Sequence, residues 1–225
     1  MRRLFLLLSL LLLPTSAACA TQIPAAYSAH PIRGWVVDAS TGQPLEGVIV
    51  VAQWILYDTG MGGQNPRGRL EVLETVTAGD GSYAFPGWGP KPNPRVTVDI
   101  AHYYACCFLT DRDPQLSFFK AGYRKLRLIN QRSHDSSTRT SGWDGKTIEL
   151  ERFRGSPEDW ARVLDSLQTD VSWGRELDWR ASPRIVLAIE DERLRLPERA
   201  AWSVSTLEVL GTSREEILRV LRGKP

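Results

Sequence analysis

Histidine and cysteine are the residues of this chain most able to hold a metal ion, and its 225 residues include three of each. A zinc peptidase needs a His-x-x-Glu type of pair, in which imidazole and carboxylate share one metal. None of the histidines has glutamate three places further on. The pairs are His30 with Arg33, His102 with Ala105, and His134 with Ser137. The sequence excludes this kind of site at the level of the motif.

His102 lies close in sequence to Cys106 and Cys107, and imidazole with thiolate suits zinc or copper. No fourth ligand accompanies them. We favour the interpretation that His102 stands at a strand end and that Cys106 and Cys107 are two small buried side chains. A disulfide between the adjacent cysteines is disfavoured, because neighbouring side chains of a strand point to opposite faces. With Cys19 the chain has too few cysteines for a disulfide framework.

Other catalytic motifs are also missing from the sequence. No Gly-x-Ser-x-Gly elbow occurs, and the glycine-rich residues 60–63 lack the lysine of a phosphate-binding loop. We therefore expect no enzymatic activity and no cofactor. Two of the eight tryptophans, Trp88 and Trp143, stand in glycine-containing turns, where an exposed ring could stack on a glycan. The alternative is that both rings belong to the core.

The N-terminal residues have the order of a secretory signal. Arg2 and Arg3 precede an apolar run of residues 4–13, and small residues follow up to Ala20. A permanent membrane helix needs roughly 20 apolar residues, so this segment is predicted to be a removed leader. Two cleavage sites compete: release after Ala20, and a lipobox-like site that would leave an acylated Cys19. The protein is expected in the periplasm or anchored to the outer membrane.

The charge balance gives no reason to expect a polyanionic partner. The chain has 28 basic and 26 acidic residues, and the leader carries two of the basic ones. We expect no nucleic-acid binding, and membrane attachment only through a lipid on Cys19. Arg124, Lys125 and Arg127 form a short basic cluster that alternates with leucines. This pattern predicts the solvated face of a strand.

Short apolar segments separated by turn residues predict an antiparallel β-sandwich of about seven strands. The sandwich is expected to follow a linker, residues 21–30. The expected strands are residues 34–38, 48–57, 70–77, 82–85, 95–101, 122–130 and 146–151. The intervening residues 58–69, 86–94 and 131–145 are rich in glycine, proline or polar residues and are expected to be loops.

From residue 155 the apolar period changes to that of a helix. Ser156 and Pro157 are suited to a helix start, and apolar residues then recur at helical spacing from Trp160 to Leu167. Further helices are expected from Ser182 toward residue 196 and from about Ser213 to Gly223. Because residues 48–57 are apolar on both faces, we expect these helices to cover the outer face of the sheet that contains them.

Three motifs resemble the carboxypeptidase regulatory-like, or transthyretin-like, domain family. They are GWVVD at residues 34–38 with TGQPLEGV at 41–48, DGSYAF at 80–85, and KAGY at 120–123. Ala78 stands where this family commonly has an acidic residue. The resemblance covers about residues 31–151 and implies an immunoglobulin-like sandwich. Such domains usually support folding or mediate contacts, and are seldom catalytic alone.

These observations divide the chain into a signal peptide (1–20), a linker (21–30), a sandwich (31–151) and a helical extension (155–225). The function that fits them is a non-catalytic protein of the cell envelope that binds or scaffolds a protein partner. One alternative is a module that binds glycan or peptidoglycan through Trp88 and Trp143. Another is a hydrolase whose site the motifs do not reveal.

Overall fold

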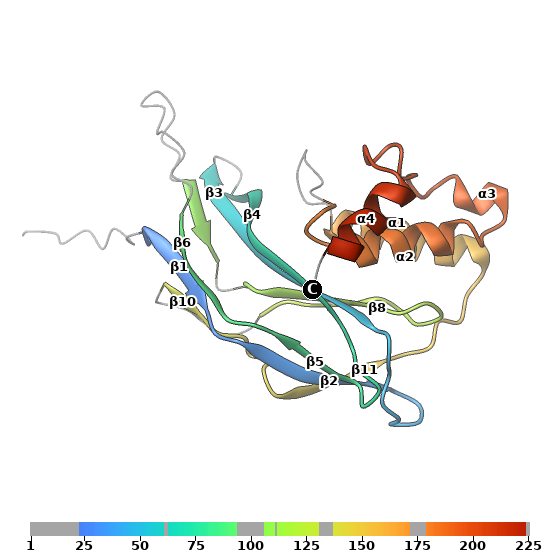
Figure 1. Ribbon diagram of the computed structural model, residues 1–225, viewed down its shortest axis with the longest axis horizontal. Helices are drawn as coiled ribbons and strands as arrows, with labels where there is room; N and C mark the ends of the chain where they lie inside the picture. The colour runs from blue at the N-terminus through green and yellow to red at the C-terminus, as the bar shows by residue number, and fades with distance from the viewer. Residues whose placement is uncertain are drawn as a thin grey trace, which may run out of the picture.

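A mainly β architecture with a helical unit on one side is seen in the computed structural model (Figure 1). The structure describes residues 23–60, 63–93, 106–110, 112–130, 137–171 and 179–223. Within these ranges there are eleven strands and four helices. The predicted fold class, a β-sandwich with C-terminal helices packed on one sheet, is confirmed.

Two three-stranded sheets form the first layer of the sandwich. Their strand orders are β10-β1-β6 and β11-β2-β5. The bounds are β10 (Thr138–Arg139), β1 (Ala26–Ala29), β6 (Trp88–Pro92), β11 (Lys146–Leu150), β2 (Ile32–Asp38) and β5 (Ser82–Phe85). Most pairings in the sandwich are antiparallel, but β1 with β10 and β2 with β11 are parallel. The predicted antiparallel character holds for the other pairings, and the two parallel pairs lie at edges of the first layer.

The second layer is a single sheet in the order β4-β3-β8-β9, with β7 also paired to β3. Its strands are β4 (Gly63–Val76), β3 (Ile49–Gly60), β8 (Gln115–Phe119), β9 (Leu126–Leu128) and β7 (Cys106–Leu109). Alternate residues of β3, among them Val50 and Trp54, face the first layer and join Phe85 and Phe118 in the core. This alternation follows from the two-residue period of a strand.

The Asp-Gly turn predicted before β5 has the required backbone geometry. Gly81 has φ +76°, and a Cβ there would lie 2.5 Å from the Val36 carbonyl oxygen. Only glycine fits at this point without a shift of the backbone. The Ser82 amide donates to the Asp80 carboxylate at 2.9 Å, which holds the turn closed.

Several segments expected to be loops or linkers form strands. Residues 58–69 close the long hairpin of β3 and β4, residues 86–94 contain β6, residues 131–145 contain β10, and the linker contains β1. Proline is tolerated in β4 and β6 because both are edge strands, where a missing N–H leaves no ladder bond unmade. Strands β7 and β8 were not predicted. Residues 122–130 form only the short strand β9 and an isolated bridge between Tyr123 and Arg152. The predicted strand 95–101 lies outside the described residues.

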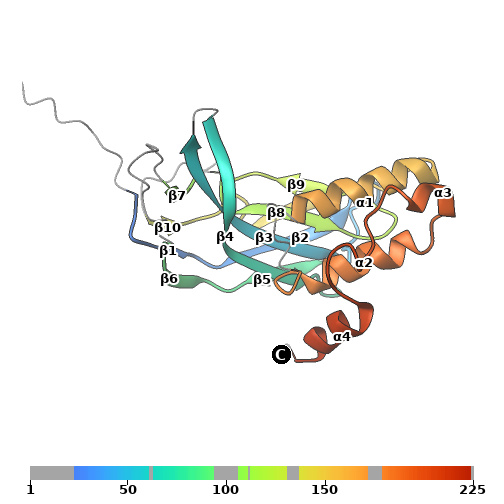
Figure 2. The ribbon, with the colours of Figure 1, turned by 90° about the horizontal axis from the view of Figure 1, so that it is seen from above.

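The helices begin where the period of the sequence changes. They are α1 (Pro157–Val171), α2 (Pro183–Arg193), α3 (Glu198–Ala201) and α4 (Arg214–Gly223). The Ser156 hydroxyl accepts from the Asp159 amide at 3.1 Å, and the Ser213 hydroxyl from the Glu216 amide at 3.2 Å, so both predicted caps are present. Helix α3 was not predicted. Figure 2 shows the helices gathered beside one end of the sandwich.

Candidate functional site

The outer face of the second sheet is the platform on which the helices dock. Val51 of β3 and Phe119 of β8 are buried in an apolar cluster with Trp160, Leu164 and Ile185 of the helices. The Phe119 and Trp160 rings stack with their centroids 6.1 Å apart. The prediction that the helices cover the outer face of the sheet containing β3 is therefore confirmed.

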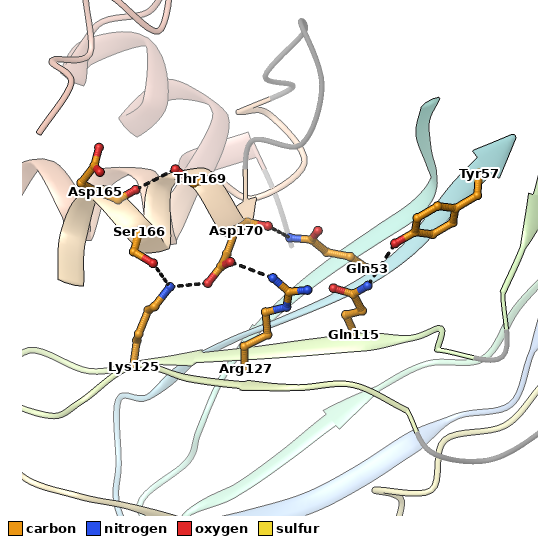
Figure 3. Close-up of polar contacts among 9 residues, drawn as sticks. All are labelled: Gln53, Tyr57, Gln115, Lys125, Arg127, Asp165, Ser166, Thr169 and Asp170. Carbon is orange, nitrogen blue, oxygen red and sulfur yellow. Dashed lines mark hydrogen bonds and ion pairs between the residues drawn. The ribbon is translucent and has the colours of Figure 1, made fainter. Parts of the chain in front are cut away.

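Polar contacts fix the end of α1 over this sheet (Figure 3). The Asp170 carboxylate pairs with Lys125 and accepts from Arg127 Nη1 at 3.0 Å. Gln53 Nε2 on β3 donates to the Asp170 carbonyl at 3.2 Å, and Lys125 Nζ donates to the Ser166 hydroxyl at 2.6 Å. Lys125 and Arg127 thus face the helix and are mostly buried, so the expectation of a solvated strand face is wrong for them.

Helix α2 is capped by a residue of the sheet. Both oxygens of the buried Glu74 carboxylate on β4 accept hydrogen bonds from the first turn, from the Arg184 amide at 3.0 Å and the Ile185 amide at 2.9 Å. Ser182 occupies the N-cap position, yet its buried hydroxyl makes no hydrogen bond within the described residues. The helical unit is therefore held on the sandwich by apolar packing, by ion pairs and by a cap supplied from the sheet.

Asp113 is a fully buried carboxylate near the end of the second sheet. Its oxygens accept from the Ile55 amide at 3.0 Å and the Thr110 amide at 3.2 Å. Ile55 lies between the part of β3 that pairs with β8 and the part that pairs with β7. The Asp113 carboxylate therefore accepts the Ile55 amide hydrogen bond that a neighbouring strand would otherwise accept. Burial raises the pKa of Asp113 to about 7, and the two amide hydrogen bonds and Arg139 oppose that shift.

The outward surface of the helical unit carries exposed apolar side chains. Trp202, directly after α3, is 85% exposed, and it lines a hollow of about 400 Å³ with Glu198 and Arg199. Leu194 after α2 and Val209 before α4 are also exposed. Trp202 lies between two predicted helices and belongs to the apolar face of neither. This position was the one feature of the sequence that could have indicated a surface residue.

The tryptophans proposed for glycan stacking pack against the sandwich core. The Trp88 ring is half-buried and meets Trp54 edge-on, with the ring centroids 5.1 Å apart. Trp143 is also half-buried, and its Nε1 donates to the Ile129 carbonyl at 3.1 Å. Both rings are therefore partly covered by the core, and glycan stacking on them stays a prediction.

Cys107 is disulfide-bonded, so the expectation of a free buried thiol is wrong for this residue. Cys19, His102 and His134 lie outside the described residues, as does the predicted signal peptide. Within the described ranges, no group of three or more His, Cys, Asp and Glu side chains could hold a metal ion. None of the helices described has the length and apolar character needed to cross a membrane.

The fold and surface define a β-sandwich protein with a helical unit docked on one sheet. No family model and no curated protein matches the chain. Among solved structures, 3-chlorocatechol 1,2-dioxygenase from Rhodococcus opacus 1CP is 15% identical, with a TM-score of 0.29 over 57% of this chain and 61% of that one. Hydroxyquinol 1,2-dioxygenase from Pseudomonas putida DLL-E4 is 18% identical, with a TM-score of 0.27 and 59% of each chain covered.

The major pilin SpaD from Corynebacterium diphtheriae is 15% identical, with a TM-score of 0.25 over 57% of this chain and 33% of that one. The chain therefore spans about three fifths of the two dioxygenases and a third of the pilin. At such low TM-scores these likenesses carry no argument about activity. The resemblance to carboxypeptidase regulatory-like domains stays a prediction.

Proposed function

We propose that this chain is a non-catalytic, exported protein of the cell envelope that binds a protein partner through its helical unit. The supporting observation is the exposure of Trp202 beside Glu198 and Arg199. Tryptophan and arginine are enriched among the residues that dominate protein interfaces. Burial of a large, water-exposed aromatic ring by a partner lowers the free energy of the complex.

The way the helical unit is fastened supports the same proposal. The Glu74 cap and the Asp170 ion pairs restrict the motion of α1 and α2 relative to the sheet. A surface that is already ordered loses less conformational entropy on binding. In this proposal the sandwich is the scaffold, and the helices present the contact.

Site-specific crosslinking tests the proposal. A photoreactive amino acid at position 202 should give one discrete adduct in living cells. The same amino acid at position 35 is the matched control, because Trp35 is also exposed but lies on β2, in the other layer of the sandwich. Once the partner is identified from the adduct and purified, Trp202→Ala should raise its Kd by about thirtyfold, as for a hot spot of about 2 kcal/mol. Trp35→Ala should leave that Kd unchanged.

Equal crosslinking at both positions, or a Kd that Trp202→Ala leaves unchanged, would reject the helical unit as the contact surface. Export is tested separately by mass spectrometry of the mature N-terminus. A chain that begins at Thr21 indicates a released periplasmic protein, and an acylated Cys19 indicates a lipoprotein. A protein that keeps Met1 contradicts export.

A further inference from the structure

A second hollow lies at the end of the sandwich and is lined by arginines. It measures about 330 Å³. Its walls come from the turn after β2, the connection from β8 to β9, and the segment after β11. The residues are Ala39, Ser40, Arg124, Glu151, Arg152 and Arg154. Three guanidinium groups with one carboxylate among them give this hollow an excess of positive charge.

Arg152 is held in place from the protein side. Its Nε lies 2.9 Å from the Asp38 carboxylate, and its guanidinium carbon lies 5.2 Å from the centre of the Tyr123 ring. Asp38 is buried, and it also accepts from the Tyr123 hydroxyl at 2.8 Å. Hydrogen bonds from Ser40 and Tyr123 hold the pKa of Asp38 well below its usual range, so it stays ionised.

Arg152 still has donors to offer. Its terminal nitrogens make no hydrogen bond within the part of the chain that the structure describes, and its side chain is 58% exposed. A guanidinium presents its donors as a planar fork that matches the oxygens of a carboxylate or phosphate. Asp38 and Tyr123 therefore fix the orientation of the Arg152 guanidinium and leave its terminal nitrogens free to donate to a ligand.

Arg154 and Arg124 can contact an anion without breaking a strong interaction within the protein. Arg154 is exposed and has no ion pair among the described residues, and it lines the same hollow as Arg152, two residues earlier in the chain. Arg124 is 3.6 Å from Glu151, with both side chains about two thirds exposed. An ion pair so exposed is worth little, so an anion can replace Glu151 as the partner of Arg124.

We propose that this hollow binds an oxyanion group of a small ligand, a phosphate above all, between Arg152 and Arg154 with Arg124 as the third contact. A dianionic phosphate offers more oxygens and more charge to three guanidiniums than a carboxylate does. The volume is at the lower end of the range for ligand sites, which suits one such group with a small substituent. This site is independent of the Trp202 surface.

Titration with inorganic phosphate, followed by NMR on the arginine Nε–H signals of the full mature chain, tests the proposal. The Arg152 signal should shift and saturate, whereas chloride at equal ionic strength should leave it in place. Arg154→Gln should weaken binding about tenfold, the loss expected for one arginine–phosphate contact. Glu151→Gln should tighten binding, because it frees Arg124 and removes a negative charge.

Arg33→Gln is the matched control, since Arg33 is an exposed arginine near the opposite end of β2 and should leave phosphate affinity unchanged. Arg152→Lys keeps the charge but loses the fork, and should weaken binding while thermal unfolding shows the fold intact. Tighter binding of glycerol 3-phosphate than of phosphate would point to an esterified group, and the reverse to free phosphate. An equal response to chloride, or equal losses in the Arg33 and Arg154 variants, would overturn the site.

Discussion

Replacing Glu74 with glutamine removes one of the two carboxylate oxygens that accept from the first turn of α2. Glutamine keeps one acceptor and places an NH2 group against the other amide. A charge-assisted hydrogen bond contributes about 1.5–3 kcal/mol net, and the charge at the helix N-terminus adds about 0.3–1 kcal/mol. We expect Glu74→Gln to lower the free energy of unfolding by about 2–4 kcal/mol.

Urea unfolding followed by tryptophan fluorescence measures this loss. With an m value of about 2 kcal/mol/M, the midpoint should fall by about 1–2 M. Hydrogen exchange of the α2 amides reports whether the loss arises at this helix.

Ser182→Ala is the matched control because it alters the N-cap residue itself. An N-cap serine is typically worth about 1 kcal/mol, but the Ser182 hydroxyl has no partner among the described residues. We expect a change of less than about 0.5 kcal/mol, within the range of a neutral substitution. If Ser182→Ala costs more than Glu74→Gln, the serine caps the helix and the reasoning is refuted.

Three further predictions test the buried contacts. The pKa of Asp113 is raised to about 7 in the folded protein, against about 3.9 in the unfolded chain, so the folded state keeps this carboxyl protonated to higher pH. The free energy of unfolding of the wild type should therefore fall as pH rises from about 4 to 7. Asp113→Asn should flatten this trend, as measured by urea midpoints. Leu164→Ala should cost about 2–5 kcal/mol, because the side chain is fully buried in the apolar cluster shared by the helices and the sheet. Val163→Ala should cost less than half as much, because Val163 is only half-buried. Asp170→Ala should cost about 1–3 kcal/mol and speed hydrogen exchange in the last turn of α1, since its two cationic partners lose their carboxylate; unchanged exchange would contradict this role.

Much of the architecture could be predicted from local pattern. The alternation of residues 48–57 predicted both a strand and its two apolar faces, and Val50 and Val51 do face the sandwich core and the helices respectively. Ser156 and Ser213 marked helix starts because capping involves only near neighbours in sequence. Asp80 and Gly81 marked a turn for the same reason.

The candidate surfaces could not be predicted in this way. The exposure of Trp202 depends on which side of the helical unit meets the sheet, and the arginine hollow joins three segments distant in sequence. Trp88 and Trp143 were both expected in glycine-containing turns that expose a ring. Trp88 instead begins strand β6, and both rings pack on the core.

The periods, the turns and the caps followed from local sequence, because these depend on residues within about one helical turn or one strand pair of each other. Tertiary structure alone decided that Glu74 caps α2 across 110 residues and that Lys125 pairs with Asp170 across 45. It also decided that proline-containing segments become edge strands. Such contacts depend on how layers pack, and no local spacing encodes the distance between side chains on separate layers.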